Sequence, residues 1–190
     1  ARYCREHREE ILHLLATRPV QSTYVERCGI LLPLVAAAAK AAGEPLALIE
    51  IGCSAAVLLV FDKFAYALAD GSVVAPEGAA TTVPCVVHGG PRPHIPRIAS
   101  RVGIDLDPVD VRSADDRRWL IASSLPELRS ERERLIAALD IVAATDMRLI
   151  KGDALDHIPR LLAQTSGPLC IFHSACLSYW SPEARATLDA

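Results

Sequence analysis

The sequence predicts an α/β fold in which a mostly parallel, Rossmann-like sheet carries helices on both faces. Three short runs, Leu46–Ile51, Arg148–Lys151 and Pro168–His173, have the length and composition of buried strands. Each is followed by a small or polar turn and then by a helical pattern. Strands that alternate with helices in this way favour a parallel sheet covered on both sides.

The bulk composition fits a folded domain without a strongly charged partner. The chain has 190 residues, of which 51% are hydrophobic, and its formal net charge is −3. This length suffices for one domain with a full core or for two small ones. The weak negative charge gives no reason to expect nucleic acid or an anionic membrane as a partner. The six cysteines form no Cys-x-x-Cys pair, which indicates reduced thiols and a cytoplasmic location.

Residues 1–43 predict a helical segment packed on the core, and residues 44–190 the Rossmann-like domain. Arg2–Thr17 has amphipathic spacing, and a second helix with a kink at Pro33 runs to Ala42 and stops at Gly43. Both ends of the sequence lie inside charged helical patterns. We therefore expect a piece of a longer protein, with an open sheet edge that a homodimer could cover.

The stretch from Leu46 to Ala56 predicts a binding edge of the sheet. The strand that contains Glu50 ends at Gly52, which can adopt backbone angles that a side chain would forbid. A helix is predicted at Ala55–Tyr66, and its N-terminus would offer unpaired N–H groups to a polar or anionic group. A buried carboxylate such as Glu50 needs a partner. This is how α/β proteins build a nucleotide or cofactor cradle.

A β-hairpin insertion is predicted at about residues 69–94. The Asp-Gly pair at 70–71 is a turn signal, with strand-like runs at Ser72–Ala75 and Thr81–His88. Ile95–Arg101 is predicted as a short helix or turn. No metal site is predicted, because Cys85, His88 and His94 lack a fourth ligand at a standard spacing.

Acidic residues gather where a second strand is predicted, within Val102–Val111. Asp105 or Asp107 could bind ribose hydroxyls through paired acceptors, or the acids could form a turn with Pro108. The later pattern predicts helices at Ala114–Ser123, Pro126–Ala144, Ala154–Gln164 and Pro182–Leu188.

Two further residues follow predicted strands. Asp153, after Gly152, could bind a ligand or cap the next helix, and one residue can do both. His173 ends the last predicted strand, where α/β proteins do chemistry, and an ordinary histidine pKa of about 6.5 suits a general base. A hydrogen-bonded core histidine is the alternative.

Four segments in this order resemble class I S-adenosylmethionine-dependent methyltransferases. They are Glu50–Ala56, Gly103–Pro108, Lys151–Pro159 and Ile171–Ser174. The resemblance implies a Rossmann-like fold, S-adenosylmethionine as cofactor and methyl transfer to an acceptor that the sequence does not identify.

The same resemblance implies a role for each site residue. Glu50, Gly52 and Ser54 belong to the turn under the methionine part of the cofactor, and Asp105 grips the ribose hydroxyls. Asp153 meets the adenine amino group. His173 lies beside the methyl group.

Most of the chain is also similar to an uncharacterised bacterial family, domain of unknown function 2332. The similarity is carried by short motifs at 20–21, 50–59, 105–108, 119–120 and 152–153. Ser54 and Ala56 replace two glycines of the methyltransferase motif, which leaves two other functions open. Gly52-Cys-Ser-Ala-Ala56 nearly matches the G-x-S-x-G elbow of a serine hydrolase with Ser54 as nucleophile. The chain could also be a degenerate, non-catalytic binding or assembly protein.

Overall fold

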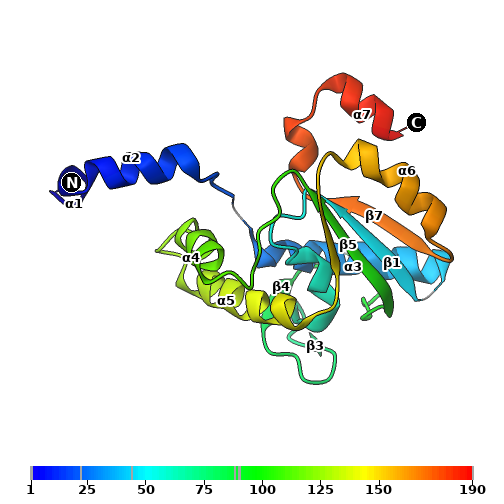
Figure 1. Cartoon of the computed structure of the whole chain (residues 1–190). Helices are drawn as coiled ribbons and strands as arrows, with labels where there is room; N and C mark the ends of the chain where they lie inside the picture. Colours follow the sequence, from blue (N-terminus) through cyan, green and yellow to red (C-terminus); the bar gives the residue numbers. More distant parts are fainter. Residues whose placement is uncertain (1, 22, 44, 88, 90, 190) are drawn as a thin grey trace.

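A four-stranded parallel sheet forms the centre of the molecule (Figure 1). The computed structural model describes residues 2–21, 23–43, 45–87, 89 and 91–189. The strands are β1 (Leu46–Ile51), β5 (Ile98–Asp105), β6 (Arg148–Lys151) and β7 (Leu169–His173), in the order β6-β5-β1-β7. All three pairings are parallel, which confirms the predicted sheet. Counted along the chain within this sheet, the order 3-2-1-4 matches the first four strands of the Rossmann order 3-2-1-4-5-6.

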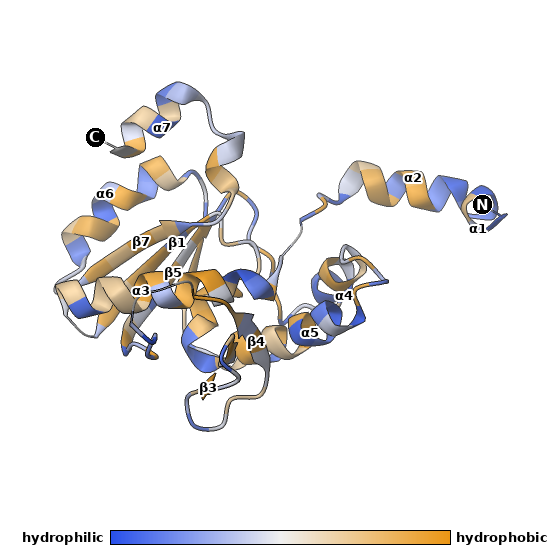
Figure 2. Ribbon diagram, turned by 180° about the vertical axis from the view of Figure 1, so that it is seen from behind, coloured by the Kyte–Doolittle hydropathy of each residue, from blue (hydrophilic) through white to orange (hydrophobic). Residues whose placement is uncertain are grey.

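Side chains of β1 alternate between two cores because successive residues of a strand point to opposite faces. Leu46 and Leu48 join a core with α3 (Cys28–Ala42) and α5 (Arg129–Ala144). Ile49 and Ile51 join a second core on the other face, which α6 (Ala154–Gln164) and α7 (Pro182–Asp189) cover. Glu50 therefore shares its face with Leu48 and α3. Figure 2 shows the apolar strands enclosed between these helices.

The predicted helix at Ala55–Tyr66 is wrong. After a turn, the chain forms the 3₁₀ helix η2 (Leu58–Lys63) and then the strand β2 (Ala65–Leu68). Leu58–Phe61 are all buried and Tyr66 donates its hydroxyl proton to the Phe61 carbonyl at 2.5 Å. A run that is buried on every side has no amphipathic period, so periodicity does not distinguish a helix from shorter buried elements here.

Both strand-like runs of the predicted insertion form strands, but each pairs with β2, just before the insertion, in a small separate sheet of order β3-β2-β4. The Asp-Gly turn joins β2 to β3 (Val73–Val74) as an antiparallel hairpin, whereas β4 (Thr82–Cys85) pairs with β2 in parallel. The prediction of helix or turn up to Arg101 is wrong in its second half, because β5 begins at Ile98. Of the two alternatives for the acidic segment, the strand is confirmed as far as Asp105.

The N-terminal helices differ in how they pack. α1 (Arg2–Glu6) and α2 (Arg8–Thr17) have no buried residue and project away from the sheet in Figure 1. The 3₁₀ helix η1 (Val25–Arg27) leads into α3, which packs on the sheet and ends at Gly43 with a φ of 100°. α4 (Ala114–Ala122) begins at Ser113 and packs beside α5. In the part of the chain that the structure describes, no helix is long and apolar enough to cross a membrane.

Candidate functional site

A cavity of about 680 Å³ opens at the carboxyl ends of the parallel strands. Residues from five stretches of the chain line it: 19–21 with 23–24 and 27, then residues within 50–58, 104–107, 152–154 and 174–180, the last including part of the 3₁₀ helix η3 (Cys176–Tyr179). The strand order reverses at β1, with β5 and β6 on one side and β7 on the other. Open α/β sheets bind ligands at this switch point, and the volume lies in the range of small-molecule sites.

The turn after β1 has a left-handed backbone at every second residue. The φ angles of Gly52, Ser54 and Ala56 are 71°, 49° and 58°. A Cβ atom at Gly52 would lie 2.5 Å from the Cβ atom of Cys176, so glycine is required there for space as well as for angle. Ser54 and Ala56 are strained, because a left-handed conformation costs other residues about 1–2 kcal/mol. These are the three positions that the methyltransferase motif fills with glycine.

The expected cradle of free N–H groups is absent from this turn. Gly52 and Cys53 both donate their N–H groups to the Ile104 carbonyl, at 2.8 and 3.2 Å. Ser54 donates its N–H group to Asp105 Oδ2 at 2.7 Å, and Ala56 donates to the Cys53 carbonyl. Because no α-helix starts at the turn, these donors stabilise the loop itself. An anionic ligand group must therefore find its donors elsewhere in the cavity.

Two of the predicted acidic residues line the cavity at the ends of β5 and β6. Asp105 accepts the Ser54 N–H through Oδ2 and the Asp107 N–H through Oδ1, so it holds two loops together. Each carboxylate oxygen can accept a second hydrogen bond. Asp153 caps α6 by accepting the Leu155 N–H at 2.9 Å. The alternative ribose ligand, Asp107, also lines the cavity and forms an ion pair with Lys151 at 2.6 Å.

Glu50 lies at the base of the cavity as a buried acid. Glu50 is only 2% exposed. Among the described residues, its Oε2 atom has no hydrogen-bond partner. Burial raises the pKa of Glu50 well above its ordinary value, the nearby Asp105 carboxylate raises it further, and Arg27 partly opposes both. Burial thus favours the protonated form of the carboxyl group, which can donate as well as accept a hydrogen bond.

Sequence reasoning missed Arg27, which η1 brings to the cavity. Its Nη1 atom donates to the Ser174 carbonyl over a long 3.4 Å, and its guanidinium lies 5.3 Å from the centre of the Tyr24 ring. No carboxylate of the described residues forms an ion pair with it. No motif marks this arginine, because only the fold places residue 27 beside the end of β1.

A strap, which we define as the described residues from Pro19 to Tyr24, covers one side of the cavity. Gln21 accepts the Ser54 hydroxyl proton at 2.5 Å and donates its own amide N–H to the Asp107 carbonyl at 2.9 Å. Trp119 donates its indole N–H to the Pro19 carbonyl at 2.9 Å. Gln21 belongs to a family motif noted in the sequence, and that motif is the signal that could have assigned it to the site.

His173 is exposed and does not line the cavity, whereas the following residue, Ser174, does. Its role as general base stays a prediction. Cys176 donates its thiol to the Ile51 carbonyl at 3.1 Å, and burial raises its pKa to about 11, so it is a poor nucleophile. Of the cysteine and histidines considered for zinc, Cys85 is buried and His88 lies outside the described residues.

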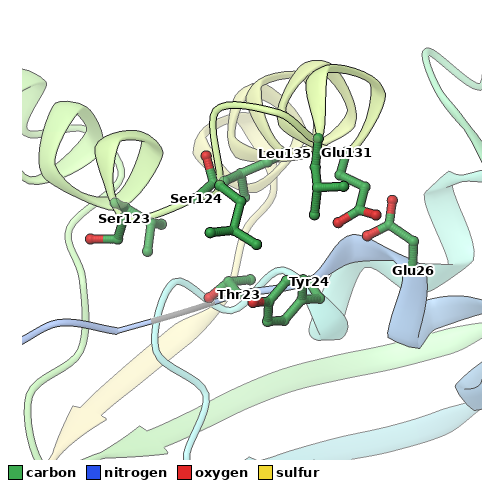
Figure 3. A pocket seen from close by; sticks show the side chains of 10 residues that line it. Thr23, Tyr24, Glu26, Ser123, Ser124, Glu131 and Leu135 are labelled. Atoms are coloured by element: carbon green, nitrogen blue, oxygen red, sulfur yellow. The ribbon is translucent and has the colours of Figure 1, made fainter.

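A second hollow, of about 20 Å³, lies between η1 and the α4–α5 pair (Figure 3). Glu26 and Glu131 point toward each other there, and Glu26 forms an ion pair with Arg134 at 2.6 Å. The volume is that of a water molecule, so this hollow is a packing defect between elements.

One comparison with known proteins found a match. A family model described as "Uncharacterized protein conserved in bacteria (DUF2332)" matches residues 1–190. Neither the curated proteins nor the solved structures gave a match.

Proposed function

We propose a function for this chain, which belongs to the bacterial family DUF2332: its cavity binds S-adenosylmethionine for methyl transfer to an acceptor still to be identified. One observation carries the proposal. Two residues other than glycine, Ser54 and Ala56, hold a left-handed conformation in the turn beside the cavity of about 680 Å³. Backbone strain persists where the surrounding structure enforces it, and it gathers at ligand sites.

The charges of the cavity divide between its two sides in a way that suits a nucleoside with a polar tail. Asp105 and Asp153 form the side of β5 and β6, where their remaining acceptor positions suit ribose hydroxyls and an adenine amino group. Gly52 lets a ligand approach the backbone of the turn between the two sides. When bound, the cofactor would supply an electrophilic methyl group, and the strap would limit its exposure to water.

The contacts of Ser54 favour this proposal over a serine hydrolase. A nucleophilic serine needs a histidine that takes its proton. Among the described residues, the hydroxyl of Ser54 donates to Gln21 and accepts from Thr23, and no histidine is in contact with it. The hydroxyl is thus engaged in holding the strap.

Calorimetric titration with S-adenosylhomocysteine tests the proposal in the variants Asp153→Asn and Asp156→Asn. Asparagine keeps the helix cap at 153 but turns an NH₂ group toward the amino group of adenine, so we expect about tenfold weaker binding. Asp156 lies in the same first turn of α6, is exposed and does not line the cavity. Its variant should bind like the wild type. Equal affinity in both variants would contradict the adenine placement, and absence of binding to the wild type would contradict the function.

A further inference from the structure

We propose that Arg27 and Glu50 form a clamp for the amino-acid group of the ligand, in which Arg27 binds the carboxylate and Glu50 the ammonium. The clamp rests on the proposed function. It adds to that function by assigning the amino-acid group of the ligand to two residues that the proposed function leaves without a role. Both residues line the cavity beside the turn at Gly52.

Arg27 forms no ion pair with any residue that the structure describes. Other arginines of the chain form ion pairs, among them Arg101 with Asp62 at 2.5 Å and Arg117 with Asp140 at 2.6 Å. Arg27 makes one long hydrogen bond to a carbonyl and lies against the Tyr24 ring, which fixes the guanidinium plane and leaves most of its N–H donors unused. A planar guanidinium binds a carboxylate through two parallel hydrogen bonds. Since the N–H groups of Gly52, Cys53, Ser54 and Ala56 are already bonded, Arg27 is the charged donor that we assign to an anionic group.

Glu50 has one buried carboxyl oxygen, Oε2, with no hydrogen-bond partner among the described residues. Five ionisable groups lie near Glu50: Arg27 from η1, Asp105 from β5, and the thiols of Cys28, Cys53 and Cys176. Arg27 is the single cation of this set, and it forms no ion pair with Glu50. The buried Oε2 atom therefore has a vacant position for a donor.

A ligand ammonium would fill that position and change the protonation of Glu50. In the free protein, burial and the Asp105 carboxylate disfavour the charged form of Glu50. An adjacent ammonium favours the charged form, so binding of an amino-acid group lowers the pKa of Glu50.

Two probes that differ only in the amino-acid group separate the clamp from nucleoside binding. S-adenosylhomocysteine carries the group, and 5′-methylthioadenosine has the same nucleoside and thioether without it. We expect Arg27→Gln to weaken binding of the first probe about ten- to hundredfold and to leave the second within about threefold. Arg118→Gln is the matched control, because Arg118 is an exposed arginine outside the cavity, and it should change neither affinity.

Calorimetric titration of Glu50→Gln with the same two probes tests the other half of the clamp. Glutamine cannot carry the negative charge that pairs with an ammonium, so we expect about tenfold weaker binding of S-adenosylhomocysteine. Binding of 5′-methylthioadenosine should stay within about threefold, which also shows that the variant folds.

The outcomes separate the clamp from the proposed function. If Arg27→Gln weakens both probes equally, or if Glu50→Gln binds S-adenosylhomocysteine as tightly as wild type, the clamp is wrong while S-adenosylmethionine binding stands. If wild-type protein binds neither probe, the clamp and the proposed function are both overturned.

Discussion

At the scale of single residues, the turn after β1 has a left-handed backbone at two residues, Ser54 and Ala56, that disfavour this conformation. Ser54 is held there by its bonds to Gln21 and Asp105. Ala56 has no polar contact through its side chain and is held by the surrounding core, in which it is fully buried. The strained backbone at this turn lowers the free energy of unfolding of the protein.

Glycine at position 56 should relieve that strain. Ala55 is a matched control, since it is equally buried at 0% exposure but is not among the residues with positive φ. We expect Ala55→Gly to lower the free energy of unfolding by about 1–2 kcal/mol, through lost methyl burial and a more flexible unfolded chain. Ala56→Gly suffers the same losses but regains about 1–2 kcal/mol of strain, so its stability should stay near that of the wild type. Urea unfolding measures both, and an equal loss in the two variants would show that position 56 is unstrained.

The sequence predicted some site residues better than others for a physical reason. Glu50, Gly52 and Asp105 lie at strand ends that can be recognised locally, from apolar runs and small residues. Arg27 lies before a helix, and a cation there has no local pattern. Only the packing of α3 on the sheet brings it to the cavity, so no reading of neighbouring residues could have found it.

At the scale of elements, a buried ion pair ties the strand β5 to the unexpected helix η2. Arg101 donates from Nε to the Leu59 carbonyl at 2.9 Å and from Nη2 to Asp62 at 2.5 Å. The two side chains are only 11% and 13% exposed, and Asp62 Oδ1 already lacks a partner among the described residues. These contacts fix the segment that follows the strained turn.

Arg101→Met should therefore be costly. Removing one partner leaves the other charge buried without compensation, and such losses amount to about 3–5 kcal/mol of unfolding free energy. The same substitution at Arg118, whose side chain is 78% exposed, should cost less than about 0.5 kcal/mol. Chemical denaturation of the two variants gives the comparison. A loss below about 1 kcal/mol for Arg101→Met would mean that the pair does not anchor η2.

Several elements were predicted with their observed bounds, whereas the segment from Leu58 to Leu68 was not. The bounds of β1, β6 and α6 agree with the prediction. β1 is buried along its whole length and α6 has one apolar face, so each pattern has a single interpretation. The segment from Leu58 to Leu68 begins with four apolar residues, and its division into η2 and β2 depends on partners far along the chain, such as Thr82–Cys85.

At the scale of the whole molecule, the strand order assembles the site. β5 and β7 flank β1, so Gly103 and Phe172 lie beside Glu50 although they are far from it in sequence. The reversal of strand order at β1 opens the sheet edge between Asp105 and Ser174. The same arrangement would serve a protein that binds its ligand without catalysis, and methyl transfer then becomes a separate question from binding.

A crystal structure of the protein with S-adenosylhomocysteine would test the proposed binding of the cofactor in the cavity. We expect density beside Gly52, with the ribose at Asp105, the adenine at Asp153 and the amino-acid group between Arg27 and Glu50. Density for the ligand at any other place, or an empty cavity at a saturating concentration, would contradict the proposed binding.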